Sequence, residues 1–209
     1  MATNLVLAVV YPHMCGLGGD LFVMVWADGR LTGLNSSGRL PAAANLEGGV
    51  VPRTGIGSAN VPGAVAGWAA LLERFGTRSL AELAQPAIRY AREGVPRAPG
   101  LAKITRLMSP LLERDREAAR IFLAEGPLTQ PDLATTLEEI ETFYEGPVAR
   151  AAPAPFCRED FAEHRAEWVE PERTQFAGIE VCEMPANSRG HLALRALERM
   201  EPIGGLSPE

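Results

Sequence analysis

The chain has 209 residues, of which 46% are apolar, and its formal net charge is −6 at neutral pH. This length is long for one domain and short for two, and the apolar content is sufficient for a sizeable core. The acidic balance argues against a nucleic-acid partner, because phosphate backbones require clustered Lys and Arg.

Membrane and export signals are not visible in the sequence. No apolar run approaches the roughly 18 residues that a membrane span needs, and no basic segment precedes an apolar one as in a secretory signal. We therefore expect no membrane partner and, by default, a cytoplasmic location. Residues 1–10 nevertheless read as the end of an apolar element already in progress, which predicts that the natural start is missing.

The first predicted feature is a glycine-rich turn that leads into a β-hairpin. Residues 11–28 read YPHMCGLGGDLFVMVWAD, with seven strand-like residues after the glycines and a second strand over residues 30–34. Asp28-Gly29 between the two strands is a strong hairpin signal. His13, Cys15 and Asp20 fall at the rim of the glycine-rich turn, which suggests a site.

Two chemical functions for this turn are disfavoured. A phosphate cradle needs a helix after the glycines and commonly a Lys, whereas Asp20 and a strand follow here. A nucleophilic pair of Cys15 and His13 is also disfavoured, because catalytic Cys and His residues usually meet from distant parts of the chain. Packing is the favoured interpretation for both residues.

The middle of the chain is predicted to be helical after a turn-rich link over residues 35–60. Apolar residues at helical spacing begin near residue 65 and end at Gly76. Ser79 and Glu82 form a capping box for a helix that ends at Gly94, and Pro86 should kink this helix or delay its start. A third helical region over residues 101–123 should break at Pro110, and a fourth spans residues 131–144.

The last part of the chain is predicted to hold a linker, one strand and one helix. Residues 151–155 read as the linker, residues 161–168 as a short helix or turn, and residues 175–184 as a strand, before a helix capped by Asn187-Ser188. Strands near the two ends and helices between them indicate an α+β fold. A hairpin plus one strand leaves unpaired edges, so the chain looks like part of something larger.

Cysteines and histidines show no pattern of a metal site. Cys15, Cys157 and Cys182 are odd in number and lack CxxC spacing, which argues against a disulfide framework and a zinc site, so each is expected to be a small buried side chain. His164 lies in a charged segment and is expected at the surface, whereas His191 is expected to be partly buried in a helix. We expect no metal and no cofactor.

Arg39 is the strongest candidate for a binding residue. It follows a strand end in the segment SSGRLP, where small neighbours leave the loop open. An arginine in such a place can bind a substrate carboxylate through two parallel hydrogen bonds. The alternative is a surface arginine whose stem covers apolar surface.

Six segments resemble motifs of the gamma-glutamyltransferase (gamma-glutamyltranspeptidase, glutathione hydrolase) family, in the family's order. The first resembles its P-H-x-x-G-x-G-G signature, and the others follow as far as residue 190. The segments are HMCGLGGDLF at 13–22, VPGAVAGW at 61–68, LAQPAIRYAREG at 83–94, QPDLA at 130–134, FYEG at 143–146 and MPANSRG at 184–190.

The resemblance implies part of an N-terminal-nucleophile hydrolase, an αββα sandwich made from a self-cleaving proenzyme. In this family the freed N-terminal Thr of the small subunit is the nucleophile, and an acyl-enzyme passes a γ-glutamyl group to water or an amine. No segment corresponding to that Thr occurs here. Residues 1–209 are thus expected to form one partial domain, the large-subunit portion, whose partner is the small subunit. The alternative is a non-catalytic truncated remnant or interaction partner.

The substrate-binding motif departs from the family pattern. With Pro41 aligned to the family's R-E-T-A-P motif, the carboxylate-binding arginine falls on Ser37, and Arg39 stands two residues later. The S-G-R-x-P version resembles a branch that includes cephalosporin and glutaryl acylases. Two residues along an extended segment keep the same face, so Arg39 is expected to reach the same carboxylate, with the Gly16-to-Gly19 turn forming the adjacent wall. The expected substrate is an amide of a γ-glutamyl or related acidic acyl group.

Overall fold

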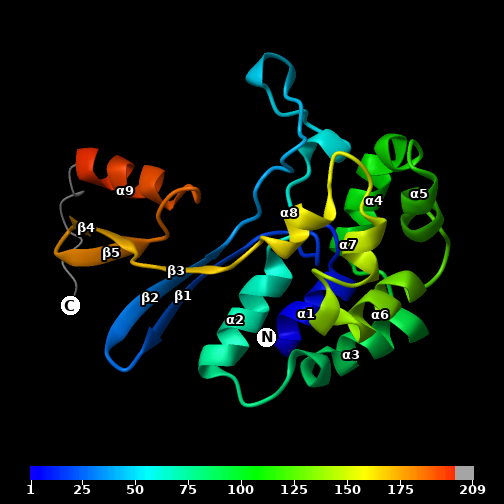
Figure 1. Ribbon diagram of the computed structural model, residues 1–209, viewed down its shortest axis with the longest axis horizontal. Coiled ribbons are helices and arrows are strands. Elements are labelled where there is room, and N and C mark those ends of the chain that lie inside the picture. The colour runs from blue at the N-terminus through cyan, green and yellow to red at the C-terminus, as the bar shows by residue number, and fades with distance from the viewer. Residues whose placement is uncertain (201–209) are drawn as a thin grey trace.

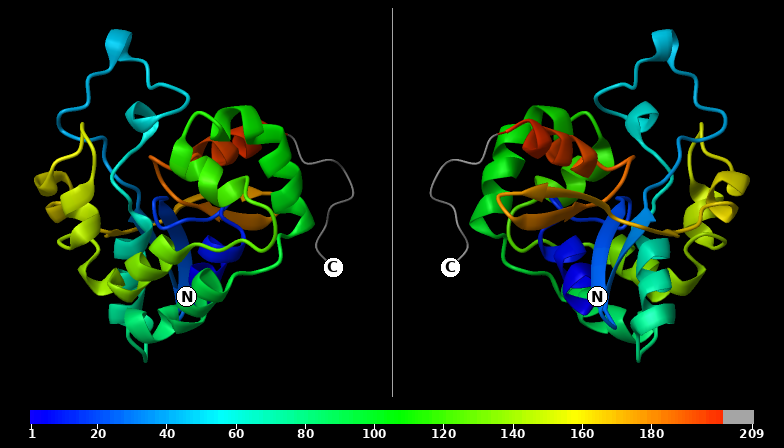
Figure 2. Two further views of the ribbon diagram at one scale, coloured as in Figure 1. Left: turned by 90° about the vertical axis from the view of Figure 1, so that its right-hand side faces the viewer. Right: turned by 90° about the vertical axis from the view of Figure 1, so that its left-hand side faces the viewer.

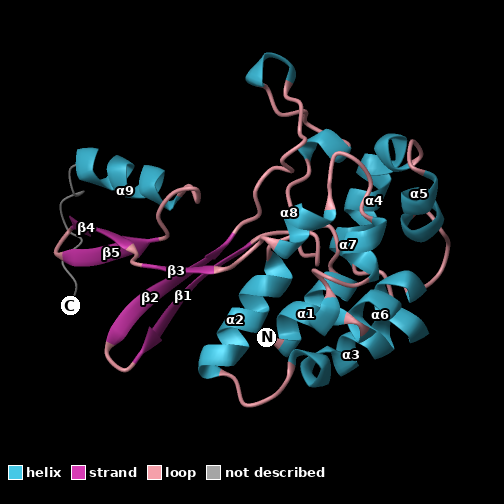
Figure 3. Ribbon diagram, in the orientation of Figure 1, coloured by secondary structure: helices cyan, strands magenta, loops and turns pink. Residues whose placement is uncertain are grey.

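The computed structural model describes residues 1–200, which form a helical body, a three-stranded sheet and a small β-hairpin unit (Figures 1 and 3). Among these residues, no helix is both long and apolar enough to cross a bilayer. The helices are α1 Ala2–Val10, α2 Ala64–Phe75, α3 Leu80–Glu93, α4 Pro99–Leu112, α5 Arg116–Phe122, α6 Pro131–Glu138, α7 Pro147–Ala151, α8 Arg158–Ala162 and α9 Gly190–Arg199. The strands are β1 Leu21–Ala27, β2 Arg30–Ser36, β3 Glu167–Val169, β4 Glu172–Phe176 and β5 Ile179–Glu183.

The main sheet is antiparallel in the order β1-β2-β3. The predicted hairpin is confirmed: Asp28 and Gly29 have φ of 52° and 74°, which are the left-handed conformations that a tight two-residue turn requires. Helix α2 packs on one face of β1 and β2 (Figure 1). On the other face, Phe22, Met24 and Trp26 are exposed, with Trp26 at 68%. The thin sheet expected from the sequence is therefore present.

The strand that joins this hairpin is not the predicted one. Residues 175–184 belong instead to a separate hairpin of β4 and β5, which turns at Ala177 and Gly178 with φ of 52° and 80° and carries α9. The main sheet is completed by β3, so the predicted helix or turn over residues 161–168 is wrong at its end, where Trp168 is in a strand. Gly178 is a single turn signal inside an apolar pattern, so the sequence predicts one continuous strand there.

The helix bounds contradict the later start that was one of two effects predicted for Pro86, and the break predicted at Pro110. Helix α3 begins at Leu80, where the Ser79–Glu82 capping box is complete, and it includes Pro86 rather than starting after it. Helix α4 includes Pro110 and ends at Leu112. The break before α5 comes from Asp115, whose carboxylate accepts the Ala118 N–H at 2.8 Å and caps the new helix.

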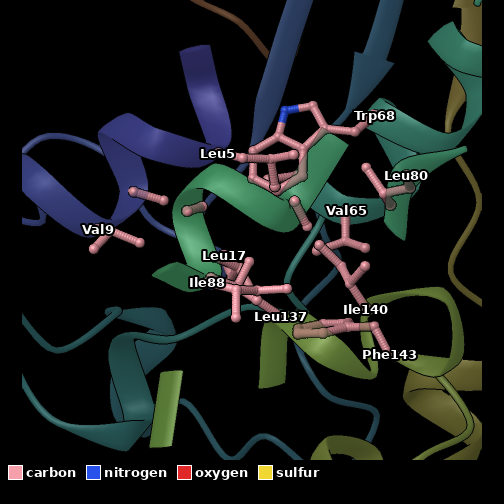
Figure 4. Packing of buried hydrophobic residues seen from close by; sticks show 14 of the residues in the cluster. Leu5, Val9, Leu17, Val65, Trp68, Leu80, Ile88, Leu137, Ile140 and Phe143 are labelled. Carbon is pink, nitrogen blue, oxygen red and sulfur yellow. The ribbon is translucent and has the colours of Figure 1, made fainter. Parts of the chain in front are cut away.

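The core lies where α1, α2, α3 and α6 meet (Figure 4). Helix α3 packs against both α1 and α6. Trp68 of α2 is 2% exposed and is the largest fully buried side chain. The amide of the buried Gln130 donates to the Val9 carbonyl oxygen at 2.8 Å, which joins the end of α1 to the start of α6. Residues 43–58 project away from this body (Figure 2).

Candidate functional site

The glycine-rich turn ahead of β1 caps a helix. The Gly19 carbonyl oxygen accepts the Gly63 N–H at 2.9 Å and the Ala64 N–H at 2.8 Å. These two groups belong to the start of α2, where backbone N–H groups lack partners within the helix. The turn therefore fixes α2 against the hairpin, in agreement with the structural interpretation of its glycines.

His13, Cys15 and Asp20 do not converge on one site. The His13 ring lies 4.1 Å from the Tyr11 ring, centroid to centroid, and lines an apolar cavity of about 290 Å³ beside α4. Cys15 is half-buried. The contact with Tyr11 agrees with the packing role expected for His13, whereas Asp20 contacts the loop after β2, so His13 and Asp20 do not share one site.

Asp20 anchors the loop that follows β2. Its carboxylate accepts hydrogen bonds from the Ser37 hydroxyl at 3.1 Å, the Gly38 N–H at 3.0 Å and the Asn60 amide at 2.9 Å. Three donors from two segments hold the backbone immediately before Arg39. Nothing in the sequence pattern indicated this role, because the donors lie 17 to 40 residues away.

Two glycines allow the segments on either side of this anchor to touch. A Cβ on Gly38 would overlap the Val61 carbonyl oxygen, and one on Gly63 would overlap the Ser36 carbonyl oxygen. The Val61 N–H also donates to the Arg39 carbonyl oxygen at 2.9 Å. The loop bearing Arg39 is thus packed backbone to backbone against the segment that enters α2.

Arg39 itself is exposed. Within residues 1–200 its guanidinium makes no hydrogen bond or ion pair, and it lines two cavities of about 250 Å³ and 570 Å³. Ser37 lines the larger one. The Gly16-to-Gly19 turn lines neither cavity, so the expectation that it forms the adjacent wall is wrong. Its neighbour Asp20 acts on the site through the loop instead.

Asn187 closes the larger cavity from the other end of the chain. The side-chain carbonyl oxygen of Asn187 accepts a hydrogen bond from the side-chain amide of Asn35 at 2.9 Å, and the side-chain amide of Asn187 donates to the Ser37 hydroxyl at 3.0 Å. The predicted Asn187-Ser188 cap of the last helix is mostly wrong, because the N-cap residue of α9 is Arg189, which makes no side-chain cap hydrogen bond. Ser188 accepts the Gly190 N–H at 3.1 Å, whereas Asn187 belongs to the cavity.

His164 is a site residue that the sequence did not indicate. It was expected at the surface but is 9% exposed, and its ring is stacked on Tyr144 with centroids 5.5 Å apart. Its Nε2 lies 3.3 Å from the buried Ser36 hydroxyl, and it lines both cavities that Arg39 lines. A histidine in a charged segment carries no signal of burial, which depends here on α2 and on Tyr144.

Burial lowers the pKa of His164, because a charged imidazolium loses hydration there. The nearby carboxylates of Asp20 and Glu167 oppose this shift, while the cationic Arg39 and Arg165 add to it. Burial also raises the pKa of Tyr144, whose hydroxyl donates to the Pro62 carbonyl oxygen at 2.7 Å. Both rings are therefore neutral near pH 7.

We expect the stability of the chain to fall as the pH is lowered below about 6.5, the ordinary histidine pKa. Between that value and the lower pKa of folded His164, the unfolded state binds more protons, so acid favours unfolding. Urea midpoints measured at pH 7.5 and 5.5 should show this loss, and the loss should be smaller in His164→Gln. An equal loss in both proteins would contradict the assignment.

Cysteine and metal chemistry adds no further candidate. In the part of the chain that the structure describes, no group of three or more His, Cys, Asp and Glu residues could hold a metal ion. All three cysteines are free. Cys157 is exposed and Cys15 and Cys182 are half-buried, so the expectation that each is buried is wrong.

Comparisons with known proteins agree with the resemblance seen in the sequence. The family description "Gamma-glutamyltranspeptidase" matches residues 1–207. The glutathione hydrolase-like YwrD proenzyme of Bacillus subtilis is 33% identical over 96% of this chain, which covers 43% of that protein. The chain thus spans less than half the length of this curated relative.

Solved structures show the same relationship. Cephalosporin acylase from Bacillus halodurans matches 94% of this chain and 42% of its own, with 33% identity and a TM-score of 0.83. Gamma-glutamyltranspeptidase from Helicobacter pylori matches 90% of this chain and 63% of its own, with 28% identity and a TM-score of 0.81. These neighbours confirm the predicted α+β class and its place among N-terminal-nucleophile hydrolases.

Proposed function

Because this chain belongs to the gamma-glutamyltranspeptidase family, we propose that residues 1–209 are the large-subunit part of a gamma-glutamyltransferase-like amidohydrolase. The substrate is an amide of a γ-glutamyl or related acidic acyl group, which is transferred to an amine or to water. The observation that carries this proposal is Arg39, an arginine without a protein partner among residues 1–200 that lines a polar cavity.

The role of this chain is to hold the acyl group. Arg39 binds the carboxylate of that group through a two-pronged, charge-assisted pair of hydrogen bonds. Asp20 holds the backbone of Ser37 and Gly38, so the arginine is presented from a fixed loop. Ser37 and Arg39 line one cavity, which supports the idea that Arg39 replaces the family's arginine from two residues further along.

The bond-breaking chemistry belongs to a partner. We assign the nucleophile to the N-terminal Thr of a small subunit, which attacks the scissile carbonyl and forms an acyl-enzyme. The exposed row of Phe22, Met24 and Trp26 on β1 supports a protein partner on that face of the sheet. Relatives named as proenzymes support the same arrangement.

Replacing Arg39 with alanine is expected to lower kcat/KM for a γ-glutamyl anilide at least tenfold in the full-length gene product. The lost charge-assisted pair should be only partly restored by Arg39→Lys, since an ammonium cannot make the planar fork. Arg53→Ala removes an exposed arginine that lines neither cavity, and it should have no effect.

A fall of less than threefold in Arg39→Ala would refute the role of Arg39. Mass spectrometry of the same full-length product should show cleavage into two subunits, the smaller beginning with Thr. An uncleaved product without turnover would support the alternative of a non-catalytic protein.

A further inference from the structure

The tautomer of His164 follows from the hydrogen bonds of Ser36. The Ser36 hydroxyl has one proton, and it donates that proton to the Gly63 carbonyl oxygen at 2.6 Å, since a carbonyl can only accept. The contact of 3.3 Å between the same hydroxyl oxygen and His164 Nε2 therefore requires the imidazole to donate. A neutral His164 with its proton on Nε2 has a free lone pair on Nδ1.

That lone pair has no partner from the part of the protein that the structure describes. The hydrogen bonds of His164 within residues 1–200 involve Nε2 and the backbone, and none involves Nδ1. The ring is held on one face by stacking on Tyr144 and at one edge by Ser36. His164 lines both cavities that Arg39 lines and a third one beside Tyr144, so its unpaired Nδ1 is available as an acceptor in this region.

Arg39 and His164 offer opposite hydrogen-bonding chemistry. A guanidinium only donates and selects a carboxylate, whereas Nδ1 of a neutral imidazole only accepts and selects an N–H or O–H group. A plain dicarboxylic acyl group would satisfy Arg39 and leave Nδ1 unpaired. An acyl group with an amino group next to its carboxylate would satisfy both.

We propose that His164 is a specificity-determining residue whose Nδ1 accepts a hydrogen bond from the amino group of the acyl donor, so that the site selects γ-glutamyl over glutaryl groups. The inference rests on the proposed function for the role of Arg39. What it adds is the acceptor at His164 Nδ1, which predicts a preference for γ-glutamyl over glutaryl groups that Arg39 alone cannot create. Three carboxylates, Asp160, Glu163 and Glu167, also line the cavities. Asp160 already accepts the N–H groups of Ala42 and Cys157, so Glu163 and Glu167 are the competing acceptors.

The tautomer is tested directly on the 209-residue chain. Nitrogen-15 NMR of the three histidines, with His164 assigned by the signals lost in His164→Gln, should show a protonated Nε2 and an unprotonated Nδ1 at pH 7.5. Added glutamate should shift the His164 Nδ1 resonance, whereas glutarate, which lacks the amino group, should not. A protonated Nδ1, equal responses to the two ligands, or no response to glutamate overturns the inference.

The preference is tested on the full-length gene product with γ-glutamyl and glutaryl anilides. His164→Gln keeps an amide near Ser36 but places no acceptor at Nδ1, so it should lower the ratio of the two kcat/KM values at least fivefold. His164→Asn places an amide at the Nδ1 position and should restore part of that ratio. The inference is overturned if Glu163→Gln or Glu167→Gln lowers the ratio of the two kcat/KM values while His164→Gln leaves that ratio unchanged.

The two proposals fail in distinguishable ways. If Arg39→Ala lowers kcat/KM for both substrates while His164→Gln leaves the ratio of the two values intact, the carboxylate site stands and the acceptor role of His164 is wrong. If Arg39→Ala changes kcat/KM for neither substrate, the proposed binding role of Arg39 fails, whatever the tautomer of His164.

Discussion

Replacing Gly38 with alanine is expected to destabilise the chain by at least about 3 kcal/mol, at the upper end of what overpacking costs. The added Cβ would overlap the Val61 carbonyl oxygen, and because that atom belongs to the backbone it cannot rotate away. The two segments would have to separate, which breaks the hydrogen bonds that Gly38 and Arg39 make with Asp20 and Val61. Urea unfolding followed by circular dichroism measures the loss.

Gly18→Ala is the matched control for this substitution. Gly18 belongs to the glycine-rich turn, has no positive φ, and a Cβ there would meet no atom within 4 Å. We expect its free energy of unfolding to stay within about 0.5 kcal/mol of the parent. If Gly38→Ala were as stable as Gly18→Ala, the close backbone packing behind Arg39 would be disproved.

Trp68→Ala should destabilise the chain by about 3–5 kcal/mol, the usual cost of truncating a buried aromatic side chain. Trp68 lies among residues of α1, α2 and α3 in the core, and it is 2% exposed (Figure 4). Its Nε1 is buried without a hydrogen-bond partner in the described part of the chain. Removing that unsatisfied group offsets part of the loss, so a value near the lower limit is expected.

Trp26→Ala provides the comparison for Trp68→Ala, since it deletes the same side chain from the exposed face of β1, where Trp26 is 68% exposed. Its effect on unfolding should be below about 1 kcal/mol. Circular dichroism is again the readout, because each variant removes a fluorophore. Similar losses in the two variants would mean that the core is not centred on α2.

The elements predicted correctly from the sequence are those with a local physical cause. The Asp28-Gly29 turn, the Ser79–Glu82 capping box and the glycine that ends α3 each act within a few residues. A short window of sequence therefore contains the whole explanation. Arg39 was also identified locally, from small neighbours at a strand end, and its exposure and cavity agree with that reasoning.

The features that sequence reasoning missed depend on distant partners. His164 is buried because Tyr144 and Ser36 contact it in the folded chain. Asp20 anchors its loop because Asn60 and the segment of Ser37 donate hydrogen bonds to it. The Ala177-Gly178 turn had a weaker local signal than the apolar pattern around it. For His164 and Asp20 the deciding interaction lies outside any window over which periodicity or propensity can be counted.

The spacing of the Ser36–His164 contact has a consequence for how the cavity assembles. Asp20 and Gly38 are 18 residues apart, whereas Ser36 and His164 are 128 apart. Closing the longer loop costs about 1.7 kcal/mol more in chain entropy, other contacts being equal. We therefore expect the contacts of the Arg39 loop to form before the contact between Ser36 and His164, so that the donor half of the cavity forms before the acceptor half.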